Sequence, residues 1–151
     1  MTDLLRRTTL LVRDAEAAAR FHEQVWGWTR FLDRPFVLSG RQLPAGAAGD
    51  ETRLIVLRAA DPYIGMLGLL QLAEPPPPAP PPTRIAHGAP IFVVAASDCR
   101  ATVERARGLG ARVHAEPEAW ETQGADGSRL RMLGAGLWDP EGYFFEVNER
   151  L

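Results

Sequence analysis

The sequence predicts an α+β fold made of two consecutive modules with the same element order, β-α-β-β-β. A β-rich run that ends at an aspartate, followed by a helical segment that ends at a glycine, occurs at residues 8–27 and again at 91–110. Three strand-like segments follow each occurrence, and a proline-rich stretch separates the two halves. Because the same order of sequence features occurs twice, we expect a duplicated module.

The first module starts with TTLLVRD at residues 8–14, a run rich in β-branched and aliphatic residues. Asp14 can cap the following helix, because its carboxylate accepts hydrogen bonds from free N–H groups of the first turn. The segment AEAAARFHEQVW carries apolar residues at helical spacing, and Gly27 stands where a left-handed residue ends a helix. The strands that follow are expected at residues 29–32, 53–57 and 65–72.

The second module repeats this order from residue 91. Asp98 is the expected helix cap and Gly110 the expected helix end. The later strands are expected at residues 112–115, 128–133 and 143–148. The sequence DPEG before the last strand is typical of a tight turn, because proline suits its second position and glycine its fourth.

The stretch EPPPPAPPPT lies between the modules. Proline lacks the backbone N–H that helices and central strands require, so this stretch predicts an exposed polyproline II connector. We therefore expect a single domain over residues 1–151, with a first module at 5–74, a connector at 75–86 and a second module at 87–151.

Composition narrows the classes of partner. The formal net charge of −2 gives no reason to expect nucleic acid or an acidic membrane surface as a partner. The single cysteine, Cys99, rules out an internal disulfide and a cysteine-cluster zinc site. No apolar run approaches the roughly 18 residues of a membrane helix. The start of the chain does not resemble a secretory signal, and we expect a cytoplasmic protein.

The last strand contains a carboxylate among large apolar residues. Strand alternation places Tyr143, Phe145 and Val147 on one face and Phe144 and Glu146 on the other. A carboxylate buried there without partners is costly. Glu146 therefore either faces water or serves a site.

The two modules, the helix DAEAAARFHEQVWGW and the ending DPEGYFFEV together resemble the vicinal oxygen chelate superfamily. This group includes glyoxalase I, bleomycin-resistance proteins, fosfomycin-resistance enzymes and extradiol dioxygenases. The resemblance covers essentially the whole chain. It implies that the modules form a curved mixed sheet around a central cavity, and that the protein is a homodimer.

The resemblance also implies a candidate divalent metal site. Glu146 is similar to the family's last metal ligand and is the candidate catalytic residue. The family's two first-strand ligand positions fall on Arg7 and Ile91, neither of which can bind a metal. Gln71, which we align with Glu146 at the end of the first module, and His87, through a shifted register, are the other candidate metal ligands.

A metal-free cavity is the second possibility. Arg7 and Thr9 share the strand face that the resemblance places toward the cavity, where Arg7 could pair with Glu146 or hold an anion. The alternative for Arg7 is a solvated arginine at a strand start. The candidate ligand-binding residues are Arg7, Thr9, Arg53, Gln71, Arg131 and Trp138. We interpret His22 as structural, His114 as a surface or edge residue, and Trp26, Trp28 and Trp120 as packing residues.

Two functions remain open on the sequence alone. The first is a glyoxalase-like enzyme, a metal-dependent lyase, isomerase or dioxygenase-like protein, in which a divalent ion on Glu146 polarises vicinal oxygens of a small substrate. The second is a metal-free protein of the bleomycin-resistance type that binds and sequesters a small molecule.

Overall fold

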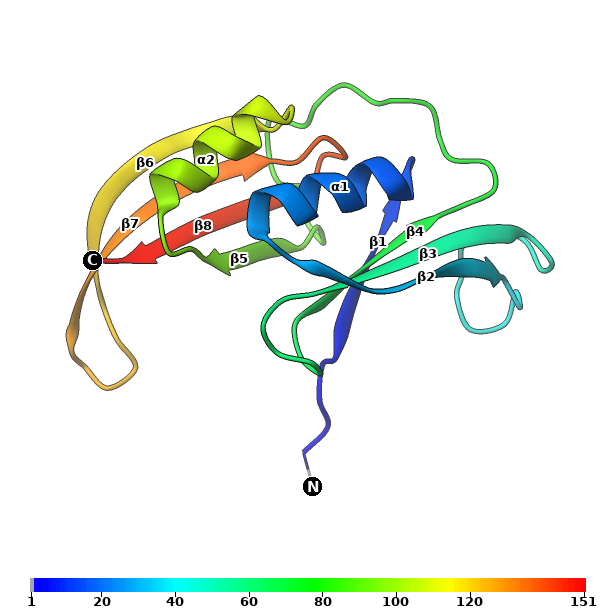
Figure 1. Ribbon diagram of the computed structural model, residues 1–151, viewed down its shortest axis with the longest axis horizontal. Helices are drawn as coiled ribbons and strands as arrows, with labels where there is room; N and C mark the ends of the chain where they lie inside the picture. Colours follow the sequence, from blue (N-terminus) through cyan, green and yellow to red (C-terminus); the bar gives the residue numbers. More distant parts are fainter. Residues whose placement is uncertain (1) are drawn as a thin grey trace. The chain divides into compact units, whose positions relative to one another are not determined.

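The computed structural model describes residues 2–151, which form two helices and eight strands (Figure 1). The first half contains β1 (Arg7–Val12), α1 (Ala15–Trp26), β2 (Thr29–Val37), β3 (Glu51–Arg58) and β4 (Met66–Gln71). The second half contains β5 (Ile91–Ala95), α2 (Cys99–Gly108), β6 (Arg112–Gln123), β7 (Arg129–Trp138) and β8 (Phe144–Arg150). The predicted α+β class and the repeated element order are confirmed.

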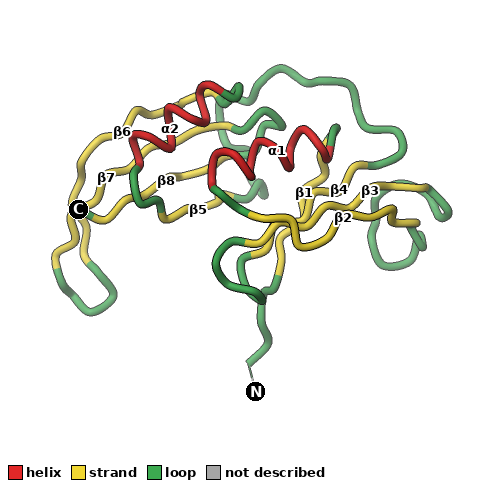
Figure 2. The backbone as a smooth tube through the Cα atoms, viewed as in Figure 1, coloured by secondary structure: helices red, strands yellow, loops and turns green. Residues whose placement is uncertain are grey.

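The chain divides into two compact units, the first ending at Ala79 and the second beginning at Pro80. The boundary lies within the proline-rich stretch. Each unit holds one helix and one four-stranded sheet (Figure 2). Within residues 2–151, neither helix is long and apolar enough to cross a bilayer.

Both sheets have the same topology. Their strand orders are β1-β4-β3-β2 and β5-β8-β7-β6. The first and last strands of each module pair in parallel, and the remaining neighbours pair antiparallel. The helix lies between the first two strands in sequence, and it supplies the long connection that a mixed sheet of this kind needs.

Helix capping follows the sequence pattern. Asp14 Oδ1 accepts a hydrogen bond from Ala17 N at 2.9 Å, and Asp98 Oδ1 accepts one from Ala101 N at 2.8 Å. Gly27 ends α1 in the left-handed region, with φ of 72°. These positions confirm the predicted starts of both helices and the predicted end of the first.

A second hydrogen bond ties each helix to the last strand of its own module. Gln71 Oε1 accepts from Ala15 N at 2.9 Å, and Glu149 Oε2 accepts from Cys99 N at 2.8 Å. The donor is the first residue of the helix in both cases. Because strand residues alternate between faces, this contact identifies the helix-covered face of each sheet.

The helix-covered face carries an apolar core in each unit, and in the first unit the opposite face carries a second cluster of Leu54, Val56, Met66 and Leu70. In the first unit, Ile55 and Leu69 are fully buried on the same face as Gln71. In the second, Phe145 and Val147 are fully buried on the same face as Glu149. The opposite face of each sheet is not covered by the module's own helix, and both grooves described below lie there.

The edge strands are longer than the sequence pattern predicts. β2 extends to Val37 instead of residue 32, and β6 extends to Gln123 instead of residue 115. Both are exposed edge strands with many charged residues, which hide the alternating pattern. Pro35 and Pro117 interrupt them, and edge strands tolerate proline because one side of the backbone has no partner.

The Gln71 contact can be tested by removing its acceptor. Gln71→Met keeps the side-chain length and leaves the N–H of Ala15 without its partner, so we expect a loss of about 1–2 kcal/mol in the free energy of unfolding measured in urea. Gln24→Met, at an exposed position on the same helix, is the matched control. Equal stability of the two variants would contradict the assigned role.

Candidate functional site

The second unit contains a groove of about 520 Å³ on the face of its sheet that α2 does not cover. Glu149 marks the helix side of β8, and Phe145 and Val147 share that side. Glu146 and Asn148 together lie on the opposite face of the strand. Glu146 and Asn148 line the groove. The sequence prediction that Glu146 shares a face with Phe144, away from Phe145 and Val147, matches this arrangement.

Two glycines of β7 form the floor of the groove. Gly136 pairs with Glu146, and Gly134 pairs with Asn148. A Cβ on Gly136 would lie 2.8 Å from Phe144 Cζ, and one on Gly134 would lie 2.8 Å from Trp120 Nε1. Each contact is closer than real Cβ atoms allow, so glycine at both positions makes the space that these ring systems occupy.

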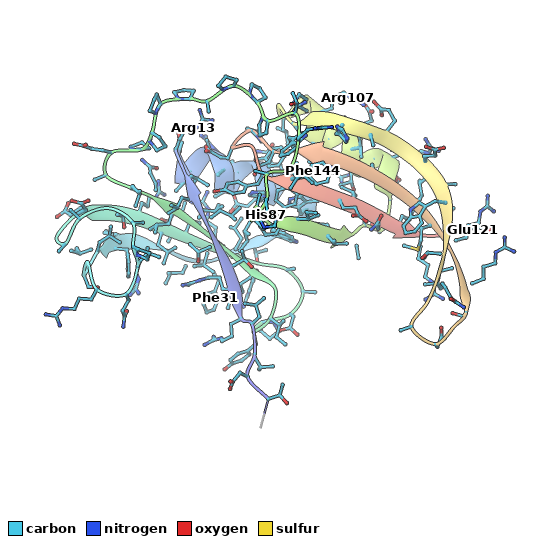
Figure 3. All side chains as sticks on the ribbon, turned by 180° about the vertical axis from the view of Figure 1, so that it is seen from behind. Arg13, Phe31, His87, Arg107, Glu121 and Phe144 are labelled. Carbon is cyan, nitrogen blue, oxygen red and sulfur yellow. The ribbon has the colours of Figure 1, made fainter. Side chains whose placement is uncertain are left out.

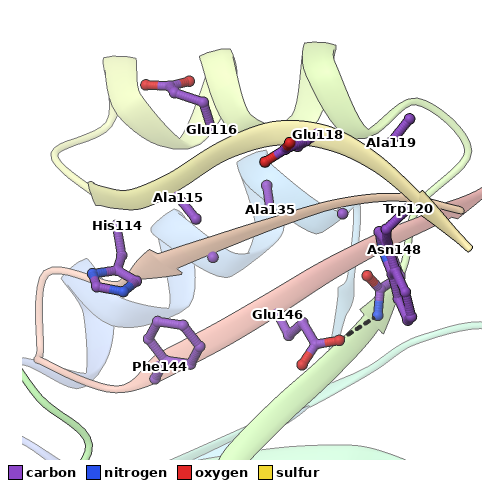
Figure 4. A pocket seen from close by; sticks show the side chains of 12 residues that line it. His114, Ala115, Glu116, Glu118, Ala119, Trp120, Ala135, Phe144, Glu146 and Asn148 are labelled. Atoms are coloured by element: carbon purple, nitrogen blue, oxygen red, sulfur yellow. Dashed lines mark hydrogen bonds between the residues drawn. The ribbon is translucent and has the colours of Figure 1, made fainter.

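Aromatic side chains stand at both ends of the groove. Phe144 and His114 lie at one end with their rings edge to face, 6.0 Å apart. Trp120 lies at the other end beside Asn148, and Glu146 stands between the ends (Figure 4). Trp120 is 43% exposed. A flat molecule placed in the groove would therefore contact aromatic surface as well as the carboxylate.

The groove is acidic. Glu146 Oε1 accepts a hydrogen bond from Asn148 Nδ2 at 2.7 Å, so the carboxylate is held in place by a neutral partner. Glu118 has no hydrogen bond or ion pair with any residue that the structure describes, whereas Glu116 is bound by Arg107 at 2.7 and 2.9 Å. No lysine or arginine is among the described residues that line the groove. The negative charges of Glu146 and Glu118 therefore have no positively charged side chain beside them in the lining of the groove.

Asn148 has an unused acceptor at the same place. Its Oδ1 is buried and has no hydrogen-bond partner among residues 2–151. A buried polar atom of this kind needs an explanation, and a donor group on a bound molecule would provide one. The groove therefore offers two kinds of acceptor, a carboxylate and an amide carbonyl, on neighbouring positions of one face.

The first unit carries a different groove on its helix-free face. It has a volume of about 410 Å³, and its lining includes Arg6, Arg7, Thr9, Phe31 and Met66. The guanidinium of Arg7 has no hydrogen bond or ion pair with another residue of the described chain. Both predicted residues of the first strand, Arg7 and Thr9, thus line one groove, and that groove is basic.

The structure corrects the alignment of the modules at their last strands. Gln71 and Glu149 make the same contact to their helices, so Gln71 corresponds to Glu149 and not to Glu146. The first-unit counterpart of Glu146 is Gly68, three residues earlier. A Cβ on Gly68 would lie 2.7 Å from Thr9 Oγ1 and 3.2 Å from Arg7 Cδ, so the neighbouring strand fills the place of an acidic side chain.

Arg53, a candidate ligand-binding residue, lies on the helix side of its sheet in an ion-pair network. Its Nη2 contacts Glu16 Oε2 and Asp33 Oδ2, each at 2.8 Å. Arg30 joins the same carboxylates and also binds Glu23 at 2.8 Å. The Arg30 hydrogen bond, with Arg53 contributing, lowers the pKa of Glu16 from its usual 4.5 to about 2. The hydrogen bond from Arg53 lowers the pKa of Asp33.

The three remaining candidates, His87, Arg131 and Trp138, lie in different settings, and His22 in another. His87 is exposed in the segment that leads into β5 (Figure 3), and Arg131 is exposed on the helix side of β7. Trp138 is buried on the groove side of the same strand, 5.0 Å from the Phe144 ring. His22 is buried, and its Nδ1 accepts a hydrogen bond from Trp26 Nε1 at 2.9 Å, as a structural histidine would.

Several residues that line the groove were not predicted as site residues from the sequence, among them His114, Glu118, Trp120, Phe144 and Asn148. His114 and Trp120 belong to the long edge strand β6, whose extent the sequence pattern hides. Asn148 stands two residues after Glu146, and the period of two along a strand was the signal that could have found it.

Neither groove presents the full set of metal ligands that the family resemblance implies. In the first, Gly68 offers no side chain and Arg7 is permanently protonated. In the second, Glu146 is hydrogen-bonded to Asn148, and the first-strand position is Ile91. Among residues 2–151, no group of three or more His, Cys, Asp or Glu side chains is arranged to hold a metal.

Comparison with known families agrees with this fold. A family model described as a glyoxalase-like domain matches residues 7–148. The chain therefore belongs to the glyoxalase-like domain family, and with it to the vicinal oxygen chelate superfamily. No curated protein sequence matches the chain.

Solved structures show the same fold at low sequence identity. A glyoxalase family protein from Bacillus cereus is 18% identical, with a TM-score of 0.75, over 99% of this chain and 97% of that chain. A glyoxalase/bleomycin resistance protein/dioxygenase family enzyme from Burkholderia phytofirmans PsJN is 16% identical, with a TM-score of 0.58, over 99% and 100%. TioX from Micromonospora sp. ML1 is 19% identical, with a TM-score of 0.56, over 99% and 100%.

The network around Arg53 predicts a pH dependence of stability. A carboxylate with a lowered pKa stabilises the fold fully above its unfolded pKa, and this contribution is lost as the pH falls. For Glu16 the window runs from about pH 4.5 down to about pH 2. We expect urea unfolding of Glu16→Gln to lose less stability across this window than the wild type does. Glu51→Gln, at an exposed position, should follow the wild-type curve, and a Glu16→Gln curve parallel to both would contradict the assignment.

Proposed function

We propose that the protein binds and sequesters a flat organic cation in the groove of the second unit, without a metal ion. The observation that carries the proposal is the pairing of two uncompensated carboxylates with exposed aromatic surface in one groove of about 520 Å³. Ligand sites of about 300–1,000 Å³ with aromatic walls and a few placed polar groups are typical of small-molecule binding.

The chemistry of the groove selects positive charge. Glu146 and Glu118 attract a cation, and the buried Oδ1 of Asn148 can accept a hydrogen bond from its N–H group. Trp120 and Phe144 offer ring faces on which a flat cation can stack, and tryptophan is the strongest partner for this contact. An anion of the same shape would meet repulsion from both carboxylates.

The fit of the donor sets supports binding over metal-dependent catalysis. Glu146 is held by an amide, and the His and Glu side chains that line the same groove are not arranged as a group of three or more that could hold a metal among residues 2–151. As a metal-dependent lyase, isomerase or dioxygenase-like enzyme, the protein would need further ligands beside it. The homodimer and the cytoplasmic location expected from the sequence remain predictions.

Binding of thioflavin T, a planar cation, tests the proposal by fluorescence titration. We expect micromolar binding that EDTA does not change. Loss of one charge in Glu146→Gln should weaken binding about 5- to 10-fold, which corresponds to about 1–1.4 kcal/mol. Trp120→Ala should weaken it by a similar factor because the stacking surface is lost. Arg7→Gln, in the first-unit groove, is the control and should bind as the wild type does.

Three outcomes would contradict the proposal. The first is equal binding of thioflavin T by the wild type and Glu146→Gln. The second is equally strong binding of the anion 8-anilinonaphthalene-1-sulfonate that also depends on Glu146 and Trp120. The third is stoichiometric Ni, Zn, Mn or Fe in protein purified without a histidine tag, lost in Glu146→Gln, which would favour the metal-dependent enzyme.

A further inference from the structure

Two touching side chains of the second unit share three buried donors that have no acceptor. Arg112 and Trp138 are paired across β6 and β7, and the guanidinium carbon of Arg112 lies 5.6 Å from the centre of the Trp138 ring. The Nε and Nη2 atoms of Arg112 and the Nε1 atom of Trp138 are all buried without a hydrogen-bond partner among residues 2–151. Trp138 is only 4% exposed.

This concentration of unused donors is unusual in a folded protein. Buried donors are almost always paired, because leaving one unpaired loses its hydrogen bonds to water without replacement. Here the unpaired donors lie on one pair of stacked side chains, and one of the pair carries a permanent positive charge. Such a cluster points to an acceptor that residues 2–151 do not provide.

Four carboxylates of the second unit are bound by other groups. Glu116 binds Arg107, Glu146 accepts from Asn148, and Glu149 accepts from the N-terminus of α2. Asp139, which follows Trp138 directly, accepts from Tyr143 N at 2.8 Å. The ion pair that usually accompanies a guanidinium with buried N–H groups is therefore not formed by these carboxylates.

We propose that Arg112 and Trp138 form a binding site for the carboxylate of a small organic acid. All of the unused groups are donors, so the partner must be an acceptor, and a carboxylate is acceptor-only when ionised. The planar guanidinium matches the two oxygens of a carboxylate, and the indole N–H adds a third donor. A water molecule fits less well, because its own two protons would find no acceptor among these groups.

The position of the pair connects this site to the end of the groove. Trp138 and Phe144 are register partners on β7 and β8, and their rings meet edge to face at 5.0 Å. Phe144 also lines the groove, so the proposed carboxylate site adjoins the end of the groove where Phe144 and His114 lie. Glu146 is two residues further along β8, about 7 Å away along the strand. The carboxylate site has its own donors and does not depend on the proposed cation site.

The indole N–H signal of Trp138 reports on this site directly. In ¹⁵N-labelled protein at pH 7, the loss of one indole signal in Trp138→Phe assigns it. We expect this signal to shift saturably when sodium acetate replaces sodium chloride at constant ionic strength, while the Trp120 signal stays in place. Arg112→Lys keeps the positive charge but loses the two parallel N–H donors of the guanidinium, so its acetate affinity should fall at least 10-fold.

Matched variants distinguish the carboxylate site from the proposed cation site and from general effects of replacing an arginine. Arg107→Lys, which alters an arginine already paired with Glu116, should keep the wild-type acetate response. Glu146→Gln, which weakens the proposed cation site, should bind acetate at least as tightly as the wild type, because a nearby negative charge is removed. Trp138→Phe keeps the ring under Arg112 and removes one donor, so acetate should raise its melting temperature less than that of the wild type.

Three results would overturn the carboxylate site. The first is a Trp138 signal that does not move with acetate. The second is a shift of equal size when chloride alone is added from low salt, which would indicate a site for any small anion. The third is an undiminished acetate response in Arg112→Lys, provided that this variant unfolds as cooperatively as the wild type.

Discussion

In both modules the first N–H of the helix donates to a side chain of the last strand, Gln71 in one and Glu149 in the other. This contact marks the face of the sheet that the helix covers. Since strand side chains alternate, residues an odd number of positions away point to the opposite, helix-free face. Glu146 stands three residues before Glu149, so its carboxylate lies on the groove side of the sheet.

The same topology has produced two surfaces of opposite charge. At the position that Glu146 occupies in the second unit, the first unit has Gly68, and the space beside it is filled by Thr9 and Arg7. The groove of the first unit is consequently basic, and that of the second is acidic. Topology and hydrogen bonding to the helix are shared, while the few residues on the open faces differ, so the modules can serve different chemistry.

The parts of the fold set by local rules could be predicted from the sequence. Aspartate caps, helix-ending glycines and alternation along β8 depend on nearest neighbours, and they gave the element order and the face of Glu146. Contacts between distant elements could not be predicted. The alignment of Gln71 was three residues out of register because only its contact with Ala15 reveals its partner. His114 and Trp120 were missed because β6 is a charged, proline-interrupted edge strand, and the placement of Arg53 depends on acidic residues from two other elements.

The central claim is that Glu146 faces an open groove while its neighbours in sequence face the helix-covered core. In a Cys99→Ala background, single cysteines at positions 146 and 147 can be compared by their rate of reaction with a thiol reagent under native conditions. The account predicts that Glu146→Cys reacts rapidly and that Val147→Cys reacts only as the protein unfolds. Rapid reaction at position 147 with protection at position 146 would contradict it.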